Sequence, residues 1–209
     1  MALPRLGILL SGRGSNFSAI HAAIVEGTLP ATIALVLSNI PEAPGAERAR
    51  ELGLDVEILP HRGIRRSEHD QRVVRALKRY RVDWVCLAGY MRILGKDLID
   101  AYPQRIVNIH PSLLPAFPGL RAQQQAWDYG VRVTGCTVHL VDSGLDTGPI
   151  VDQATVHCRP GESPDELSAR ILEQEHALYP RSLARLLGDE WEVEGRRVVF
   201  IEDSGKKLD

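Results

Sequence analysis

Residues 106–119 read IVNIHPSLLPAFPG, and this stretch guides the prediction of both the fold and the chemistry. Three prolines follow a short apolar run, and proline continues neither a strand ladder nor a helix, so a strand is predicted to end at His110. Side chains two positions apart on a strand point to the same face. Asn108 and His110 are therefore predicted to project together, while Val107 and Ile109 face a packed layer.

An amide beside an imidazole suits a reaction in which a carbonyl oxygen becomes negative while an amine loses a proton. Asn108 and His110 thus favour acyl or formyl transfer chemistry. A simpler interpretation is open at this point. Asn108 would cap the turn, and His110 would be a hydrogen-bonded histidine of the core, as most buried polar groups are.

On the N-terminal side, the apolar run at 5–10 is typical of a strand buried on both faces. The segment SGRGSN at 11–16 follows it and precedes an amphipathic helix predicted over 17–26. Backbone N–H groups and the helix dipole at such a turn attract an anion. Phe17 stands where a dinucleotide fingerprint has its third glycine, and the P-loop lysine is absent. A single phosphate is therefore the predicted ligand, with a ligand-free tight turn as the alternative.

The remaining chain alternates apolar runs with amphipathic segments. Further strands are predicted at 32–37, 55–59, 84–88, 132–141 and 150–156, and helices at 44–52, 67–80 with Ser67 as cap, 95–102, 123–129 and 163–187, before a hairpin around Gly195. This order predicts an α/β fold with a mostly parallel, doubly wound sheet flanked by helices and an antiparallel extension toward the C-terminus. One domain, 1–209, is predicted, with halves at 1–105 and 106–209.

Composition narrows the classes of partner. The 209 residues include 25 basic and 27 acidic ones, and no long Lys/Arg run is present, so neither nucleic acid nor a membrane is a predicted partner. An odd number of cysteines, three, indicates reduced thiols in a cytoplasmic protein. Cys136 and His139 lack a second pair with metal-like spacing, so no metal is predicted.

Ligands of parallel α/β sheets bind beyond the carboxyl ends of the strands. Residues 89–94 fall at such an end and form either a slot for a flat ring or the start of the next helix's core face. The loop 142–148 falls at another, and its Asp142 and Asp146 either deliver one carboxylate to His110 or only form turns. Arg66 follows a third strand, where a guanidinium can grip a carboxylate.

Four motifs in this order resemble the phosphoribosylglycinamide formyltransferase family: SGRGSN at 11–16, GYMRIL at 89–94, NIHPSLLP at 108–115 and LDTGPI at 145–150. The last two are also similar to methionyl-tRNA formyltransferase and formyltetrahydrofolate deformylase. The phosphate loop and PAFPGL at 115–120 look like the purine enzyme. The resemblance implies direct transfer of the formyl group of 10-formyltetrahydrofolate, a co-substrate, to the amine of glycinamide ribonucleotide in de novo purine biosynthesis.

The resemblance also implies roles for individual residues. Catalysis would fall to Asn108, His110 and Asp146, and the ribonucleotide would contact Gly14, Ser15, Asn16 and Glu175. The folate would contact Arg66, Met91, Arg92, Ile93, Leu94, Asn108 and Asp142. The first half would bind phosphate, and the second would bind folate and carry the catalytic groups. The expected partners are small molecules, and the expected state is a monomer or homodimer. Two alternatives are a hydrolase of the same formyl donor and a non-catalytic folate- or nucleotide-binding protein.

Overall fold

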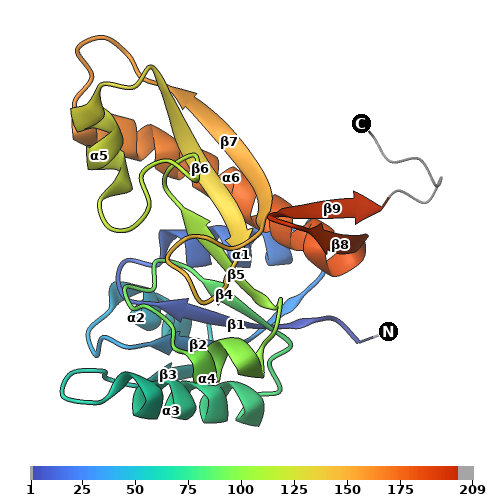
Figure 1. The fold of residues 1–209 in the computed structure, drawn as a ribbon. Coiled ribbons are helices and arrows are strands. Elements are labelled where there is room, and N and C mark those ends of the chain that lie inside the picture. Colours follow the sequence, from blue (N-terminus) through green and yellow to red (C-terminus); the bar gives the residue numbers. More distant parts are fainter. Residues whose placement is uncertain (1, 202–209) are drawn as a thin grey trace. The chain divides into compact units, whose positions relative to one another are not determined.

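A computed structural model describes residues 2–201 of the protein. The chain divides into two compact units, the first ending at Asn108 and the second beginning at Ile109 (Figure 1). The single-domain organisation stays a prediction. Each unit is described separately below.

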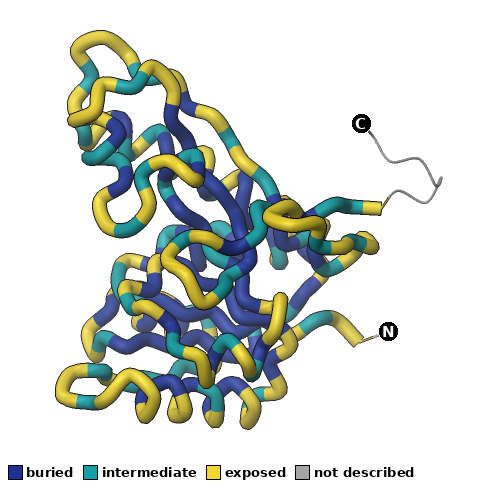
Figure 2. Tube along the Cα trace, viewed as in Figure 1, coloured by how far each residue is buried: buried dark blue, intermediate teal, exposed yellow. Residues whose placement is uncertain are grey.

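The first unit is built on parallel strands with helices between them. Its strands are β1 (Arg5–Leu10), β2 (Thr32–Ser38), β3 (Val56–Ile58), β4 (Trp84–Leu87) and the first three residues of β5 (Ile106–His110), in the order β3-β2-β1-β4-β5. All paired neighbours are parallel. Its helices are α1 (Ser15–Val25), α2 (Pro44–Glu51), α3 (Arg66–Arg79) and α4 (Lys96–Ala101). Residues 6–10 of β1 are all buried, which is why that strand needs a continuous apolar run (Figure 2).

Helix α3 lies directly on β1 because Gly7 has no side chain. A Cβ at Gly7 would lie 2.6 Å from Leu77 Cδ2, so a larger residue there would have to displace the Leu77 side chain. The helix begins at Arg66 after the extended Arg65, which makes no side-chain cap hydrogen bond. The prediction that Ser67 caps this helix is therefore wrong, because Ser67 already lies in the first turn.

The second unit carries the antiparallel extension. Strands β6 (Val133–Leu140) and β7 (Ile150–His157) are antiparallel, β9 (Arg197–Ile201) joins β7 in parallel, and β8 (Glu190–Glu194) pairs antiparallel with β9. Helix α6 (Pro164–Gly188) packs on both long strands and on α5 (Ala122–Tyr129). The start of α6 has the predicted Ser163 cap, completed by a capping box with Glu166. Together the two units confirm the predicted mixed α/β fold class.

Candidate active site

The glycine loop of the first unit positions the start of α1. Gly14 precedes the helix with φ 73°, a left-handed conformation that glycine adopts without strain, so the helix begins at Ser15 rather than at 17. A Cβ at Gly14 would lie 2.9 Å from Gly45 Cα, and Gly45 N donates to Gly12 O at 3.0 Å. The absent side chain of Gly14 thus lets the glycine loop pack against the first turn of α2. Ser15 is half-buried and Asn16 is buried at the first turn of α1.

Ser11 connects this loop to the segment that follows β4. Its N–H donates to Gly89 O at 3.1 Å, and its hydroxyl accepts a hydrogen bond from Met91 N at 2.8 Å. The same hydroxyl donates to Asn39 Oδ1 at 2.6 Å. The predicted phosphate loop and the predicted folate segment are therefore held together by one side chain.

The segment 89–95 is a loop with exposed apolar side chains. Met91 is 68% exposed and Ile93 is 53% exposed, whereas Leu94 is buried. Because α4 starts only at Lys96, the interpretation of Met91 and Ile93 as a helix core face is wrong. Half-buried Arg92 lies between them. Exposed apolar groups beside a guanidinium suit a ligand with a flat ring and an anionic tail.

Arg66 lies close to this segment although it belongs to α3. A Cβ at Gly95 would lie 3.3 Å from Arg66 Cδ, so the methylene stem of Arg66 packs against the end of the 89–95 loop. Arg66 itself is exposed. The structure therefore brings Arg66 and the loop together within the first unit, as a shared folate site would need.

Strand β5 contains Asn108 and His110. Asn108 is half-buried and is paired in register with Leu87 of β4. His110 is the last residue of the strand and is 5% exposed. Its Nε2 atom lies 2.9 Å from the carbonyl oxygen of Phe117. Since a carbonyl oxygen only accepts, Nε2 is the donor in this hydrogen bond, and Nδ1 is the second ring nitrogen.

Asp146 faces that second nitrogen. Its Oδ2 atom lies 3.5 Å from His110 Nδ1 and accepts a hydrogen bond from Gly119 N at 2.8 Å. Both side chains are almost covered, with 6% of His110 and 11% of Asp146 exposed. Asp146 has φ 53°, a conformation that aspartate tolerates better than most residues. The 142–148 loop thus delivers one carboxylate to the imidazole.

Asp142, by contrast, shapes the loop. Its Oδ1 atom accepts hydrogen bonds from Gly144 N at 3.0 Å and from Thr147 Oγ1 at 2.7 Å. A Cβ at Gly148 would lie 1.8 Å from Leu140 O, so the chain passes its own strand with no room for a side chain. The sequence left turn formation open for both Asp142 and Asp146. In the structure, Asp142 is the one whose carboxylate bonds within its own turn.

Two groups in β6 were not among the predicted site residues. His139 Nε2 lies 3.8 Å from Asp146 Oδ1, and burial lowers the pKa of His139. Thr137 Oγ1 donates to Ser112 O at 2.7 Å and accepts from Leu114 N at 3.0 Å, so it fixes the turn after His110. The sequence feature that could have identified these two residues is their polar character within an otherwise apolar strand.

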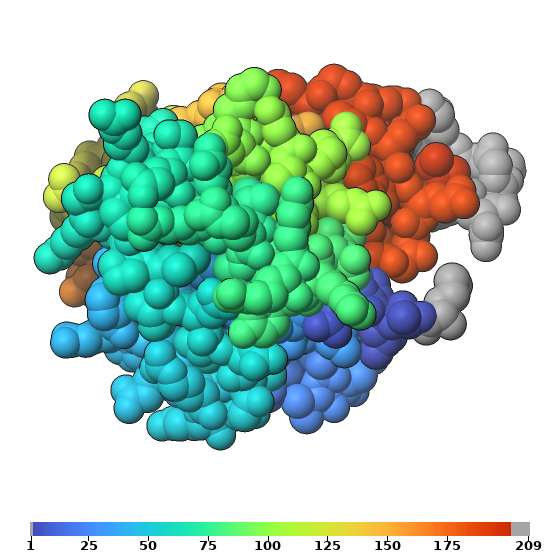
Figure 3. Space-filling view, turned by 90° about the horizontal axis from the view of Figure 1, so that it is seen from below, coloured from blue at the N-terminus to red at the C-terminus, as the bar shows by residue number. Residues whose placement is uncertain are grey.

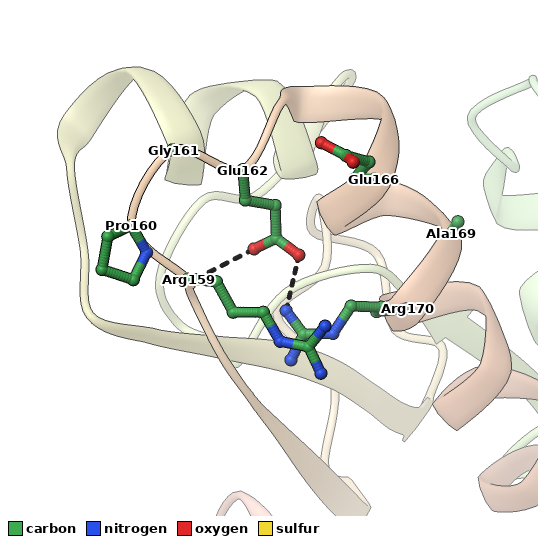
Figure 4. Close-up of a pocket in the computed structure, with 7 residues that line it drawn as sticks. All are labelled: Arg159, Pro160, Gly161, Glu162, Glu166, Ala169 and Arg170. Atoms are coloured by element: carbon green, nitrogen blue, oxygen red, sulfur yellow. Dashed lines mark hydrogen bonds and ion pairs between the residues drawn. The ribbon is translucent and has the colours of Figure 1, made fainter.

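Helix α6 carries Glu175, the remaining predicted contact, and its first turns border a surface hollow. Glu175 is only 6% exposed. A hollow of about 400 Å³ is lined by Arg159, Pro160, Gly161, Glu162, Glu166, Ala169 and Arg170 (Figure 4). It follows β7 at the strand end opposite the 142–148 loop. Its lining carries two arginines and two glutamates, and Glu162 is paired with Arg170 at 2.6 Å.

No group of three or more His, Cys, Asp or Glu side chains within residues 2–201 is arranged to hold a metal ion. The three cysteines are free thiols. In the same described range, no helix combines the length and the apolar character that crossing a membrane requires.

An imidazole–carboxylate pair at the end of a parallel strand in a mixed α/β fold suits acid–base group transfer. Residues 5–183 match the formyl transferase family model, and the chain belongs to this family. Phosphoribosylglycinamide formyltransferase of Bacillus subtilis is 38% identical over 187 residues, which cover 89% of this chain and 96% of that protein.

Two further comparisons extend the match. A crystal structure of glycinamide ribonucleotide transformylase 1 from Symbiobacterium toebii is 44% identical, with a TM-score of 0.93, and covers 96% of this chain and 95% of that one. A trifunctional purine biosynthetic protein of Drosophila melanogaster is 42% identical over 186 residues. This alignment covers 88% of the present chain but only 14% of that longer protein.

Proposed function

We propose that the protein transfers the formyl group of 10-formyltetrahydrofolate to the primary amine of glycinamide ribonucleotide, a step of de novo purine biosynthesis. The carrying observation is the His110 Nδ1 to Asp146 Oδ2 distance of 3.5 Å beside Asn108 on β5. The names of the Bacillus and Symbiobacterium relatives support the same activity. The free thiols support a cytoplasmic location.

In this proposal the two substrates bind at different segments. The phosphate of the ribonucleotide binds the N–H groups of Gly14, Ser15 and Asn16, since a helix start attracts an anion. Glu175 contacts the glycinamide part. The pterin of the folate lies against Met91–Leu94, with Asn108 and Asp142 as polar contacts. Arg66 and Arg92 supply positive charge for the carboxylates of its glutamate tail.

The chemistry is a direct attack of the amine on the formyl carbon, without a covalent enzyme intermediate. The developing oxyanion accepts hydrogen bonds from Asn108 and from the protonated imidazole of His110. Asp146 orients that imidazole and balances its charge, and it helps to carry the proton that the amine loses. The tetrahedral intermediate then collapses, and tetrahydrofolate leaves with its N10 protonated.

The hydrogen bond from His110 Nε2 to Phe117 O has a consequence for this step. In the structure both ring nitrogens of His110 face protein oxygen atoms, those of Phe117 and Asp146. A nitrogen can donate to the formyl oxygen only after it exchanges one of these partners. Because Asp146 is the group that orients the ring, the contact with Phe117 is the one expected to be exchanged.

The deciding experiment supplies purified protein with glycinamide ribonucleotide and 10-formyltetrahydrofolate. Tetrahydrofolate formation is followed by absorbance, and the formylated ribonucleotide by mass spectrometry. Stoichiometric formation of both products is expected. Formate release at the same rate without the amine would support the hydrolase instead, and binding of both ligands with no formyl product would support a non-catalytic role.

A further inference from the structure

Helix α3 buries an ionisable pair that the proposed chemistry does not use. His69 is 0% exposed and Asp70 is 1% exposed, although the helix surface around them carries charged residues open to solvent. Figure 3 shows residues of α3 and residues that follow β4 side by side on the face seen from below. Burying a carboxylate is costly unless it is hydrogen-bonded or paired with a charge. Asp70 therefore needs an explanation beyond packing.

Asp70 is bonded to the end of the 89–95 loop. Its Oδ2 atom accepts a hydrogen bond from Gly95 N at 2.6 Å, and Gly95 is the residue from which α4 starts. A Cβ at Gly95 would lie 2.5 Å from the same oxygen and 3.3 Å from Arg66 Cδ. Gly95 is thus inserted between the Asp70 carboxylate and the stem of Arg66. The two parts of the predicted folate site, Arg66 and residues 91–94, meet at this contact.

Charges from the loop surround the same carboxylate. Burial raises the pKa of Asp70, while the Gly95 N–H and the positive charge of Arg92 act in the opposite direction. Burial also raises the pKa of Tyr90, and the charge of Asp70 adds to that shift. Asp70 therefore lies within electrostatic reach of two residues of the 89–95 loop, in addition to its hydrogen bond to Gly95.

The buried polar groups around Asp70 lower the stability of the fold. Asp70 Oδ1, His69 Nδ1, Tyr90 Oη and Arg92 Nε are buried atoms with no hydrogen-bond partner among the described residues. His69 Nε2 donates to Leu59 O at 2.9 Å, and its Nδ1 lies 3.8 Å from Asp70 Oδ1. Native proteins keep few such buried atoms, and those that persist commonly serve a function. An apolar residue at position 70 would avoid this cost but would release Gly95.

We propose that Asp70 is a positioning residue for the folate: it holds Gly95 and Arg92 so that Arg66 and residues 91–94 form one binding surface. This inference rests on the proposed function, because it assumes that the folate binds these residues. Asp70 itself touches neither substrate. Its loss should therefore weaken folate binding selectively and leave the ribonucleotide site, on the glycine loop, unchanged.

The test compares Asp70→Asn and Asp70→Ala with the wild type. Asn keeps an oxygen for Gly95 N–H but loses the charge near Arg92, whereas Ala loses both. The Kd for tetrahydrofolate and the KM for 10-formyltetrahydrofolate are expected to rise about tenfold in Asp70→Asn and further in Asp70→Ala. The KM for glycinamide ribonucleotide is expected to change less than about twofold. Glu68→Gln is the matched control, since Glu68 lies on the same helix in a solvent-exposed pair with Arg72.

A purely structural role would give a different pattern. It would lower the melting temperature and raise both KM values together, and that result would overturn the inference, as would an unchanged Kd for tetrahydrofolate. Wild-type protein that forms no formylated product contradicts the proposed function instead. In that case the Kd for tetrahydrofolate still decides the role of Asp70.

Discussion

Replacing Asp146 by Asn tests the central pair of the candidate site. The variant removes the charge and little else, because Asn also adopts positive φ and its side-chain oxygen can still accept from Gly119 N. Two unit charges 3.5 Å apart in an effective dielectric of about 20 attract each other by about 5 kcal/mol. The near-complete burial of both side chains limits screening by solvent. If about 4 kcal/mol of this acts in the transition state, kcat should fall about a thousandfold.

The assay is steady-state formation of tetrahydrofolate at saturating concentrations of both substrates. Asp128→Asn is the control, since Asp128 lies on the exposed side of α5 and accepts only from Gln124 in the same helix. The control is expected to keep wild-type kcat, and Asp146→Asn is expected to keep its Kd for the ribonucleotide. A kcat within tenfold of wild type for Asp146→Asn would refute the charge-balancing role.

Three further substitutions test other parts of the structure. Ser11→Ala removes the hydroxyl that accepts from Met91 N and donates to Asn39, so the KM for both substrates should rise about five- to tenfold. A change in KM for only one substrate in steady-state kinetics would contradict the proposed link between the two loops. Gly148→Ala places a Cβ 1.8 Å from Leu140 O, so the free energy of unfolding, measured by urea titration, should drop by more than about 2 kcal/mol. The control Gly188→Ala places its Cβ where no other atom lies within 4 Å, so its free energy of unfolding should stay near that of the wild type. Burial lowers the pKa of His139 below its ordinary value of 6.5, so the unfolded chain binds a proton more readily than the folded one. The stability that this shift contributes is present above about pH 6.5 and is lost as the pH falls, and His139→Gln should flatten the loss between pH 7 and 5; equal slopes in both proteins would argue against it.

The sequence predicted the strands well because burial on both faces imposes a continuous apolar run. The run at 5–10 became β1 with the same bounds, and the proline-rich segment after His110 ended β5 where expected. Helix starts were harder to predict. The first helix begins two residues early because Gly14 takes a left-handed conformation, and α3 begins before Ser67 because Arg65 supplies the extended residue without a side-chain bond. Backbone conformation decided both starts, and residue type alone does not specify it.

The exposure of the 89–95 loop also could not be predicted from the sequence. Met91, Ile93 and Leu94 have the same apolar character, yet only Leu94 is buried. The loop ends at Gly95, the residue before α4, whose N–H donates to a carboxylate 25 residues earlier in the chain. A contact of this kind leaves no local pattern, so neither the loop's exposure nor the place of Asp70 could be inferred from spacing.

The two aspartates of the 142–148 loop illustrate the same limit at the site itself. Both lie near glycines, and turn chemistry suits either of them. The structure separates them by what each carboxylate accepts. Asp142 is satisfied within the loop by Gly144 and Thr147, whereas Asp146 accepts from Gly119, in a distant segment, and faces two imidazoles at 3.5 and 3.8 Å. A carboxylate bonded only within its own turn can define the shape of a loop. One that faces both His110 and His139 can orient an imidazole, and this difference is why the proposed catalytic role belongs to Asp146.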